Sequence, residues 1–182
     1  MRKSKDQEVL DAIEVKYFSS FADDSSFIQN IQNHVEALSM FRMYPDLFID
    51  LITPKAGSIK LGLDQRVFLR ILVRFSRAYC VFPRGYGKTF IEVLALLITA
   101  ILFPGVNLSM TAQTRESACG LIVDKFHDIL GFYPLLAECI EHYSFTKDKA
   151  LIVFKNGSRL TNLANHQSSK GKRRHRLMIE VQ

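Results

Sequence analysis

A glycine-containing turn, PRGYGKT at residues 83–89, separates two apolar segments of this chain. The short run before it, AYCVF at residues 78–82, is typical of a strand, and the long apolar run after it predicts a buried helix over residues 88–103. Strand, glycine turn and helix in succession favour an α/β fold, in which helices flank a parallel sheet.

The rest of the C-terminal part continues this alternation. A second strand is predicted in VNLSMTA at residues 106–112, followed by a helix that Thr114 caps. The turn KNGS at residues 155–158 lies between two apolar runs and predicts a β-hairpin. LMIEV at residues 177–181 is predicted as a last strand.

The N-terminal part is predicted to be helical. We expect a helical region over residues 1–60 and an α/β region over residues 61–182. Asp64 is predicted to cap a helix in which Arg66, Arg70 and Arg74 recur every fourth residue. That spacing places the three guanidinium groups on one helical face, which we expect to be exposed to solvent.

Composition excludes several classes of protein. The chain has 182 residues, 48% of them hydrophobic and 23% charged, which excludes intrinsic disorder as the main state. The net charge of +6 permits a nucleic-acid partner without requiring one. Its three cysteines lack zinc-site spacing and fit a reducing, cytoplasmic setting. We expect no secretory signal and no membrane span, because the longest apolar stretch, residues 91–103, is too short to cross a bilayer.

The turn has the chemistry of a phosphate-binding loop. Glycines let backbone N–H groups turn toward an anion at a helix N-terminus, Lys88 can reach the β- and γ-phosphates, and the Thr89 hydroxyl can bind Mg²⁺. Arg84 could neutralise charge on a transferred phosphoryl group, or it could point to solvent. Phe82 stands where the usual pattern has its first glycine, so a surface turn leading into a core helix is the alternative interpretation.

With Arg84 four residues before Lys88, the loop resembles that of the tailed-phage terminase large subunit, in its N-terminal packaging ATPase. LDQR at residues 63–66 is similar to the family's adenine-contacting segment, and TAQT at residues 111–114 resembles the turn after its second strand. The likeness extends over residues 63–180. It implies a P-loop NTPase fold of the RecA-like, additional-strand type. The additional strand would come from sequence after residue 182, so the α/β domain would be incomplete at its C-terminus.

The resemblance implies ATP and Mg²⁺ as ligands. The nucleotide-binding residues would be Gln65, Arg84, Gly85, Tyr86, Gly87, Lys88 and Thr89. Glu180 ends the last apolar run and would share Mg²⁺ with Thr89, and the catalytic groups would be Arg84 and Glu180. The family usually has aspartate followed by a catalytic glutamate at this place, whereas Glu180 is followed by Val181. The chain could therefore end before the catalytic acid, have an altered end, or use Glu180 in a shifted register, and a plain strand with a terminal glutamate is the fourth interpretation.

The resemblance also implies partners. These are double-stranded DNA, a terminase small subunit, a portal protein and further copies of the chain in a ring, all in the cytoplasm of a bacterial host. The densest basic segment could contact DNA or a neighbouring subunit, resemble a nuclear localisation run, or be a solvated loop. The candidate residues for DNA contact are Lys170, Lys172, Arg173, Arg174 and Arg176. Nothing in the sequence corresponds to the family's nuclease domain.

The implied function is ATP-driven translocation of DNA into a procapsid. We expect negligible ATPase activity from the 182-residue chain by itself, because the residue that orients the attacking water would be missing. Two alternatives remain open at this level. One is a helicase-like or other nucleic-acid-dependent ATPase, and the other is a catalytically inactive fragment that binds DNA or a protein partner.

Overall fold

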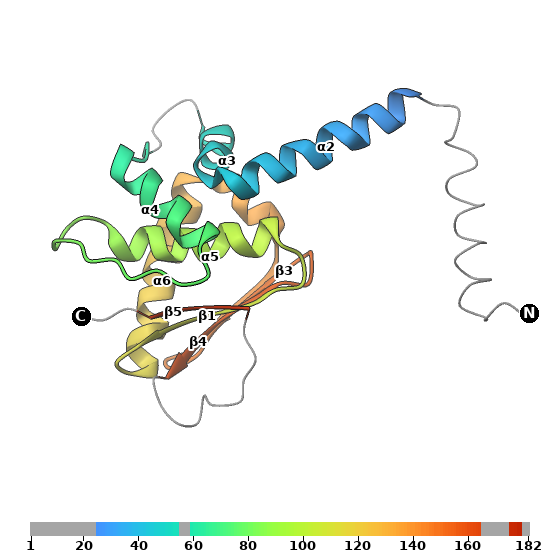
Figure 1. Ribbon diagram of the computed structural model, residues 1–182. Coiled ribbons are helices and arrows are strands. Elements are labelled where there is room, and N and C mark those ends of the chain that lie inside the picture. Colours follow the sequence, from blue (N-terminus) through green and yellow to red (C-terminus); the bar gives the residue numbers. More distant parts are fainter. Residues whose placement is uncertain (1–24, 55–58, 165–174, 180–182) are drawn as a thin grey trace, which may run out of the picture. The chain divides into compact units, whose positions relative to one another are not determined.

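The computed structural model describes residues 25–54, 59–164 and 175–179 (Figure 1). The chain divides into two units, Met1–Ser39 and Met40–Gln182, and the helix Ser25–Met43 extends across the boundary between them. No helix in the described ranges is long and apolar enough to cross a bilayer. In chain order the elements are α2 (Ser25–Met43), α3 (Pro45–Ile52), α4 (Leu63–Arg74), α5 (Lys88–Leu102), β1 (Asn107–Ala112), α6 (Arg115–Phe132), the 3₁₀ helix η1 (Pro134–Cys139), β2 (Ile140–Phe145), β3 (Ala150–Phe154), β4 (Arg159–Ala164) and β5 (Arg176–Ile179).

The second unit is an α/β structure built on one open, five-stranded sheet in the order β2-β3-β4-β1-β5. β1 runs parallel to both β4 and β5, whereas β2, β3 and β4 are joined by antiparallel pairing. The expectation of a parallel sheet is therefore wrong for two strand pairings, β2 with β3 and β3 with β4, which are antiparallel. The reason is local, since β3 and β4 are connected by a short Asn-Gly turn, which can join only antiparallel neighbours.

The prediction of a strand at residues 78–82 is also wrong. No strand is assigned there, although the side chains keep the alternation that suggested one. Tyr79 and Val81 are 90% and 76% exposed, while Cys80 and Phe82 pack against the core. The period-two pattern is thus real, but none of the described strands forms a ladder with this segment.

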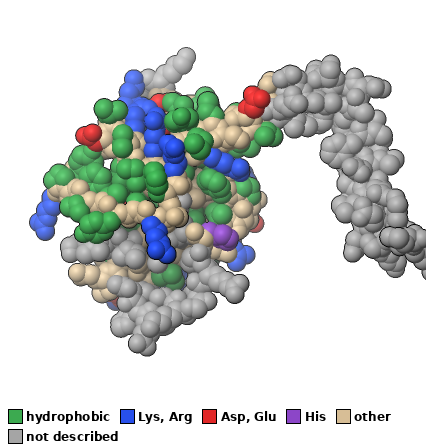
Figure 2. Space-filling view, viewed as in Figure 1, with side chains coloured by type: hydrophobic (Ala, Val, Ile, Leu, Met, Phe, Trp, Pro, Cys, Tyr) green, Lys and Arg blue, Asp and Glu red, His purple; other side chains and the backbone are tan. Residues whose placement is uncertain are grey.

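Figure 2 shows hydrophobic side chains at the surface beside lysines and arginines.

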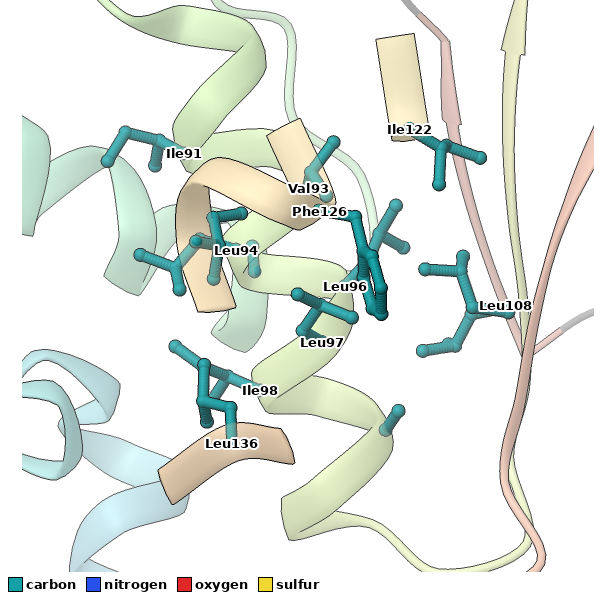
Figure 3. Packing of buried hydrophobic residues seen from close by; sticks show 14 of the residues in the cluster. Ile91, Val93, Leu94, Leu96, Leu97, Ile98, Leu108, Ile122, Phe126 and Leu136 are labelled. Atoms are coloured by element: carbon teal, nitrogen blue, oxygen red, sulfur yellow. The ribbon is translucent and has the colours of Figure 1, made fainter. Parts of the chain in front are cut away.

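The core is organised around α5, which lies between α4 and the sheet (Figure 1). Every residue from 91 to 100 is buried, because α4 and α6 pack on the helix in addition to β1 and β4. Figure 3 shows Phe126 of α6 and Leu108 of β1 directed toward Leu96 and Leu97 of α5. Each such side chain contributes about 1.5–3 kcal/mol when fully buried, so α5 supplies a large share of the stabilisation.

The predicted hairpin turn also completes the C-terminus of α5. The side-chain amide of Asn156 donates to the carbonyls of Ala100 and Ile101, at 2.8 and 3.1 Å. Ser158 Oγ donates to the Phe103 carbonyl at 3.0 Å and accepts from Val106 N at 3.3 Å. The carbonyls of a last helical turn have no hydrogen-bond donor within the helix. Here the turn between β3 and β4 supplies the donors.

We predict that Asn156→Asp lowers the free energy of unfolding by about 2–3 kcal/mol. The carboxylate cannot donate to the Ala100 and Ile101 carbonyls, and its charge lies at the negative end of the helix dipole. Urea unfolding measures the loss. The matched control is Gln113→Glu at an exposed position, which should change stability by no more than ~0.5 kcal/mol. Equal losses of stability in Asn156→Asp and Gln113→Glu would contradict the role of Asn156 as a cap of α5.

Candidate functional site

The glycine loop, residues 83–87, leads directly into the first turn of α5. Gly85 and Gly87 both have φ of +80°, a left-handed conformation that side-chain-bearing residues rarely adopt. The two glycines predicted from the sequence are therefore required by the backbone path. This path turns the chain sharply between the extended segment before the loop and the helix after it.

The N-terminus of α5 is capped by a residue without a side chain. Gly87 is the N-cap, and Ile91 N donates to its carbonyl at 3.1 Å to close the first turn. By contrast, the Thr114 hydroxyl caps α6 as predicted, accepting from Ser117 N at 3.0 Å. The first turn of α5 contains no acidic residue. Its backbone N–H groups and positive dipole end thus form the kind of surface that binds anions.

The predicted phosphate ligands lie at this helix end. Lys88 and Thr89 are the first two residues of α5 and are half-buried, whereas Arg84 is exposed in the loop. Two cations therefore flank the glycines, one fixed at the helix start and one on the solvent side. This arrangement can bind a polyanion through backbone donors and charge together.

Phe82, at the position where the usual pattern has its first glycine, packs between two aromatic rings. Its ring lies between Phe68 of α4, with ring centroids 4.5 Å apart, and Tyr86 of the loop, stacked at 4.8 Å and 12°. An aromatic column therefore ties the loop to α4. Burial, together with the nearby Asp64 carboxylate, raises the pKa of the Tyr86 phenol.

Gln65, predicted from the family resemblance as an adenine ligand, lies against the loop. Its Oε1 accepts from Gly62 N at 3.0 Å, and its Nε2 donates to the Tyr86 carbonyl at 3.3 Å. Gly62, and not Asp64 as predicted, is the N-cap of α4. The side chain of Gln65 thus joins two segments that are 21 residues apart.

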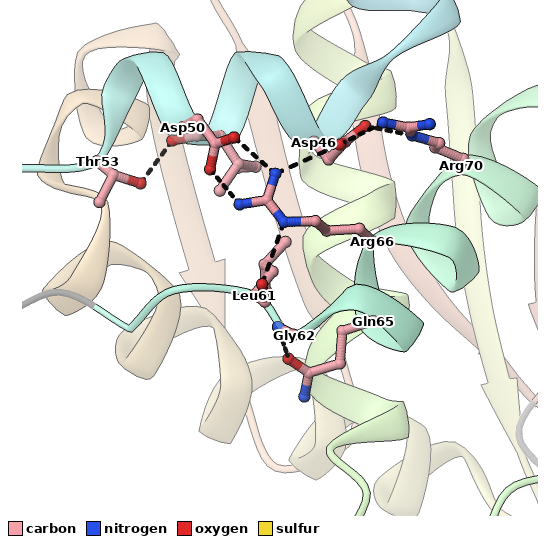
Figure 4. A network of polar contacts seen from close by, with 9 residues as sticks. Asp46, Asp50, Thr53, Leu61, Gly62, Gln65, Arg66 and Arg70 are labelled. Carbon is pink, nitrogen blue, oxygen red and sulfur yellow. Dashed lines mark hydrogen bonds and ion pairs between the residues drawn. The ribbon is translucent and has the colours of Figure 1, made fainter.

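The arginine stripe of α4 is not a free solvated face, contrary to the prediction. Arg66 makes a bidentate contact with Asp50 of α3, both distances being 2.6 Å, and Arg70 binds Asp46 at 2.6 and 2.7 Å (Figure 4). Asp46 is only 1% exposed. Burial opposes its ionisation, but the bonds and charge from Arg70 and Arg66 outweigh burial and lower the pKa of Asp46. Arg74 is exposed as predicted.

One buried acid near the loop was not predicted as functional. Glu92 lies one turn after Lys88 on α5 and is 8% exposed. Burial raises the pKa of the Cys80 thiol, and the negative charge of Glu92 raises it further. The sequence signal that could have identified Glu92 is a carboxylate within an otherwise apolar helical run. Its spacing from Lys88 puts both residues on one face of the helix.

Several predicted residues lie outside the described part of the chain. Glu180, Lys170, Lys172, Arg173 and Arg174 are among them, and Arg176 is described only as backbone. The strand leading to Glu180 is described: in β5, Ile179 pairs with Thr111 near the end of β1. In the described ranges, no three His, Cys, Asp or Glu side chains come together as a metal site would require.

No protein-family model matches the chain, and no curated protein sequence matches it. The described residues define an α/β protein whose mixed, open sheet is flanked by helices and whose glycine loop precedes the central helix.

We predict that Asp46→Asn lowers the free energy of unfolding at pH 7 by about 1.5–3 kcal/mol, the usual worth of charged hydrogen bonds. Because folding lowers the pKa of Asp46, the contribution of its carboxylate is complete above the pKa of the unfolded state and is lost as pH falls through the pKa of the folded state. Denaturant melts across this acidic range should show a flatter pH profile for the variant. Asp124→Asn, at an exposed position of α6, is the control. Parallel profiles for Asp46→Asn and wild type would refute the prediction.

Proposed function

We propose that the glycine loop binds the phosphates of ATP. The observation that carries the proposal is the union of two left-handed glycines, a helix N-terminus without a side-chain cap, and Lys88 as the first helical residue. Each element alone is common. Together they supply inward-turned N–H donors, a dipole and a cation at one place, which is what a triphosphate requires.

In this proposal each predicted ligand has a distinct task. Lys88 neutralises the β- and γ-phosphates, the Thr89 hydroxyl contributes to Mg²⁺, and Arg84 approaches the γ-phosphoryl group from the solvent side. Glu180 would supply the carboxylate of the metal site. Mg²⁺ commonly keeps several waters and takes one or two protein ligands besides phosphate oxygens, so Thr89 and one carboxylate suffice.

The finer proposal is the motor of a phage terminase large subunit, which couples ATP hydrolysis to translocation of double-stranded DNA. It rests on the sequence resemblance. Two features of the structure support it: Gln65 contacts the glycine loop from a preceding helix, and β5, which leads to Glu180, lies parallel to β1. Both features are compatible with other ATPases that act on nucleic acids.

The first test concerns the lysine. Lys88→Ala should reduce ATP affinity in the presence of Mg²⁺ by at least a hundredfold in calorimetry, because the charge that faces the β- and γ-phosphates is removed. Lys155→Ala, at an exposed position far along the chain, is the matched control and should bind as wild type does. Unchanged ATP binding by Lys88→Ala, in a variant with an intact melting transition, would contradict the proposal that the glycine loop binds phosphate.

The second test separates binding from catalysis. In a form of the protein that hydrolyses ATP, Arg84→Ala should leave the dissociation constant of ATP within about twofold and lower kcat by at least tenfold. A charge that stabilises mainly the transition state is expected to act in this way. The exposed Arg77→Ala serves as the control. Weaker binding with an unchanged kcat would make Arg84 a ground-state ligand instead.

A further inference from the structure

The Gln65 side chain has both of its polar atoms engaged by backbone groups. Oε1 is held by Gly62 N at the start of α4, and Nε2 donates to the carbonyl of Tyr86 within the glycine loop. Figure 4 shows the amide oxygen directed toward Gly62 and the amide nitrogen on the other side. The contact with the loop is close, because a Cβ built on Gly87 would lie 3.3 Å from Gln65 Nε2.

This contact determines the direction of a backbone donor. In a trans peptide the carbonyl of one residue and the N–H of the next point in opposite directions. A Tyr86 carbonyl directed toward Gln65 therefore directs the Gly87 N–H away from Gln65. Gly87 immediately precedes Lys88, so this N–H is one of the donors available to an anion at the start of α5.

Without Gln65 the same peptide could turn over. Rotating the plane between Tyr86 and Gly87 changes mainly ψ of the first residue and φ of the second, and glycine adopts either sign of φ at little cost. A turned peptide would present the Tyr86 carbonyl in place of the Gly87 N–H. A carbonyl oxygen repels phosphate, so the two orientations differ in their capacity to bind an anion.

Residues next to Gln65 on α4 make further contacts that hold this part of the helix in place. The neighbouring Arg66 donates through Nε to the Leu61 carbonyl at 3.1 Å and binds Asp50 of α3 bidentately. Phe68, on the next turn, packs against Phe82. The first turn of α4 is thus attached to α3 on one side and to the loop on the other, which keeps Gln65 at a defined distance from Tyr86.

We propose that Gln65 is a positioning residue that holds the Tyr86–Gly87 peptide with its N–H directed toward the anion, and so sets phosphate affinity independently of the base. The inference rests on the proposed phosphate-binding function. It differs from the role that the family resemblance implies, in which Gln65 reads adenine, because a base-reading residue contributes nothing to a ligand without a base.

The experiment compares ATP with inorganic tripolyphosphate, both with Mg²⁺, by calorimetry on the 182-residue chain. Gln65→Met removes both polar contacts at similar side-chain length, and Gln65→Asn keeps the amide but shortens its reach. Leu63→Ala, 77% exposed on the same helical turn, is the control. We expect both Gln65 variants to lose about tenfold to a hundredfold in affinity for ATP and for tripolyphosphate alike, the effect of one hydrogen bond to an anion. The Gly87 amide signal in ¹⁵N NMR should shift in the unliganded variants, and the control should resemble wild type.

The remaining outcomes overturn the inference in distinguishable ways. A loss confined to ATP would assign Gln65 to the base, and unchanged binding of both ligands would make it structural only. If Gln65→Met loses its melting transition, the result for Gln65→Asn decides. A wild-type chain that binds neither ligand would overturn the proposed function and this inference together, whereas wild-type binding with unaffected variants would overturn the inference alone.

Discussion

Residues 91–100 of α5 are buried on all sides, and this burial governs where the neighbouring elements must lie. A helix that is apolar around its whole circumference is stable in water only if other elements cover every face. α4, α6, β1 and β4 do so here. Because residues 91–100 leave no face for solvent, the backbone groups of α5 that lack a partner within the helix lie at its two ends and must be satisfied there. The glycine loop lies at one end and the Asn156 turn at the other, so both turns are located by the packing of the helix between them.

Features that depend on neighbouring residues were predictable from the sequence. The Asn156-Gly157 hairpin, the Thr114 cap and the extent of α5 follow from local rules, and the structure has all three. The pairing of distant segments was not predictable. Residues 78–82 have the alternation of a strand, but strand formation needs a partner that no local pattern specifies. β2 was missed because residues 141–144 are all exposed, which gives an edge strand no apolar period.

The candidate site shows the same limit. The sequence indicated Gly85, Gly87 and Lys88 correctly as a glycine turn before a helix, since that signal is contiguous. It could not indicate that Phe82 stacks between Phe68 and Tyr86, or that Arg66 and Arg70 reach back to α3. Apart from the stack on Tyr86, these contacts cross 14 to 24 residues of sequence and depend on how α4 packs. The loop is therefore supported mainly by residues that carry no motif.

The Asn156 turn has a consequence for the order in which the protein can form during synthesis. The carbonyls that it caps belong to a helix completed about 55 residues earlier in the chain. β4, which packs on α5, is likewise made only roughly 60 residues after the helix ends. At ordinary translation rates of 5–20 residues per second, about 3–12 s pass before β4 and the Asn156 turn have been synthesised. Until then α5 lacks the strand that helps to bury it and the donors that cap its C-terminus. During that interval it is a target for chaperones that bind exposed apolar segments, and substitutions that weaken the turn would lengthen its exposure.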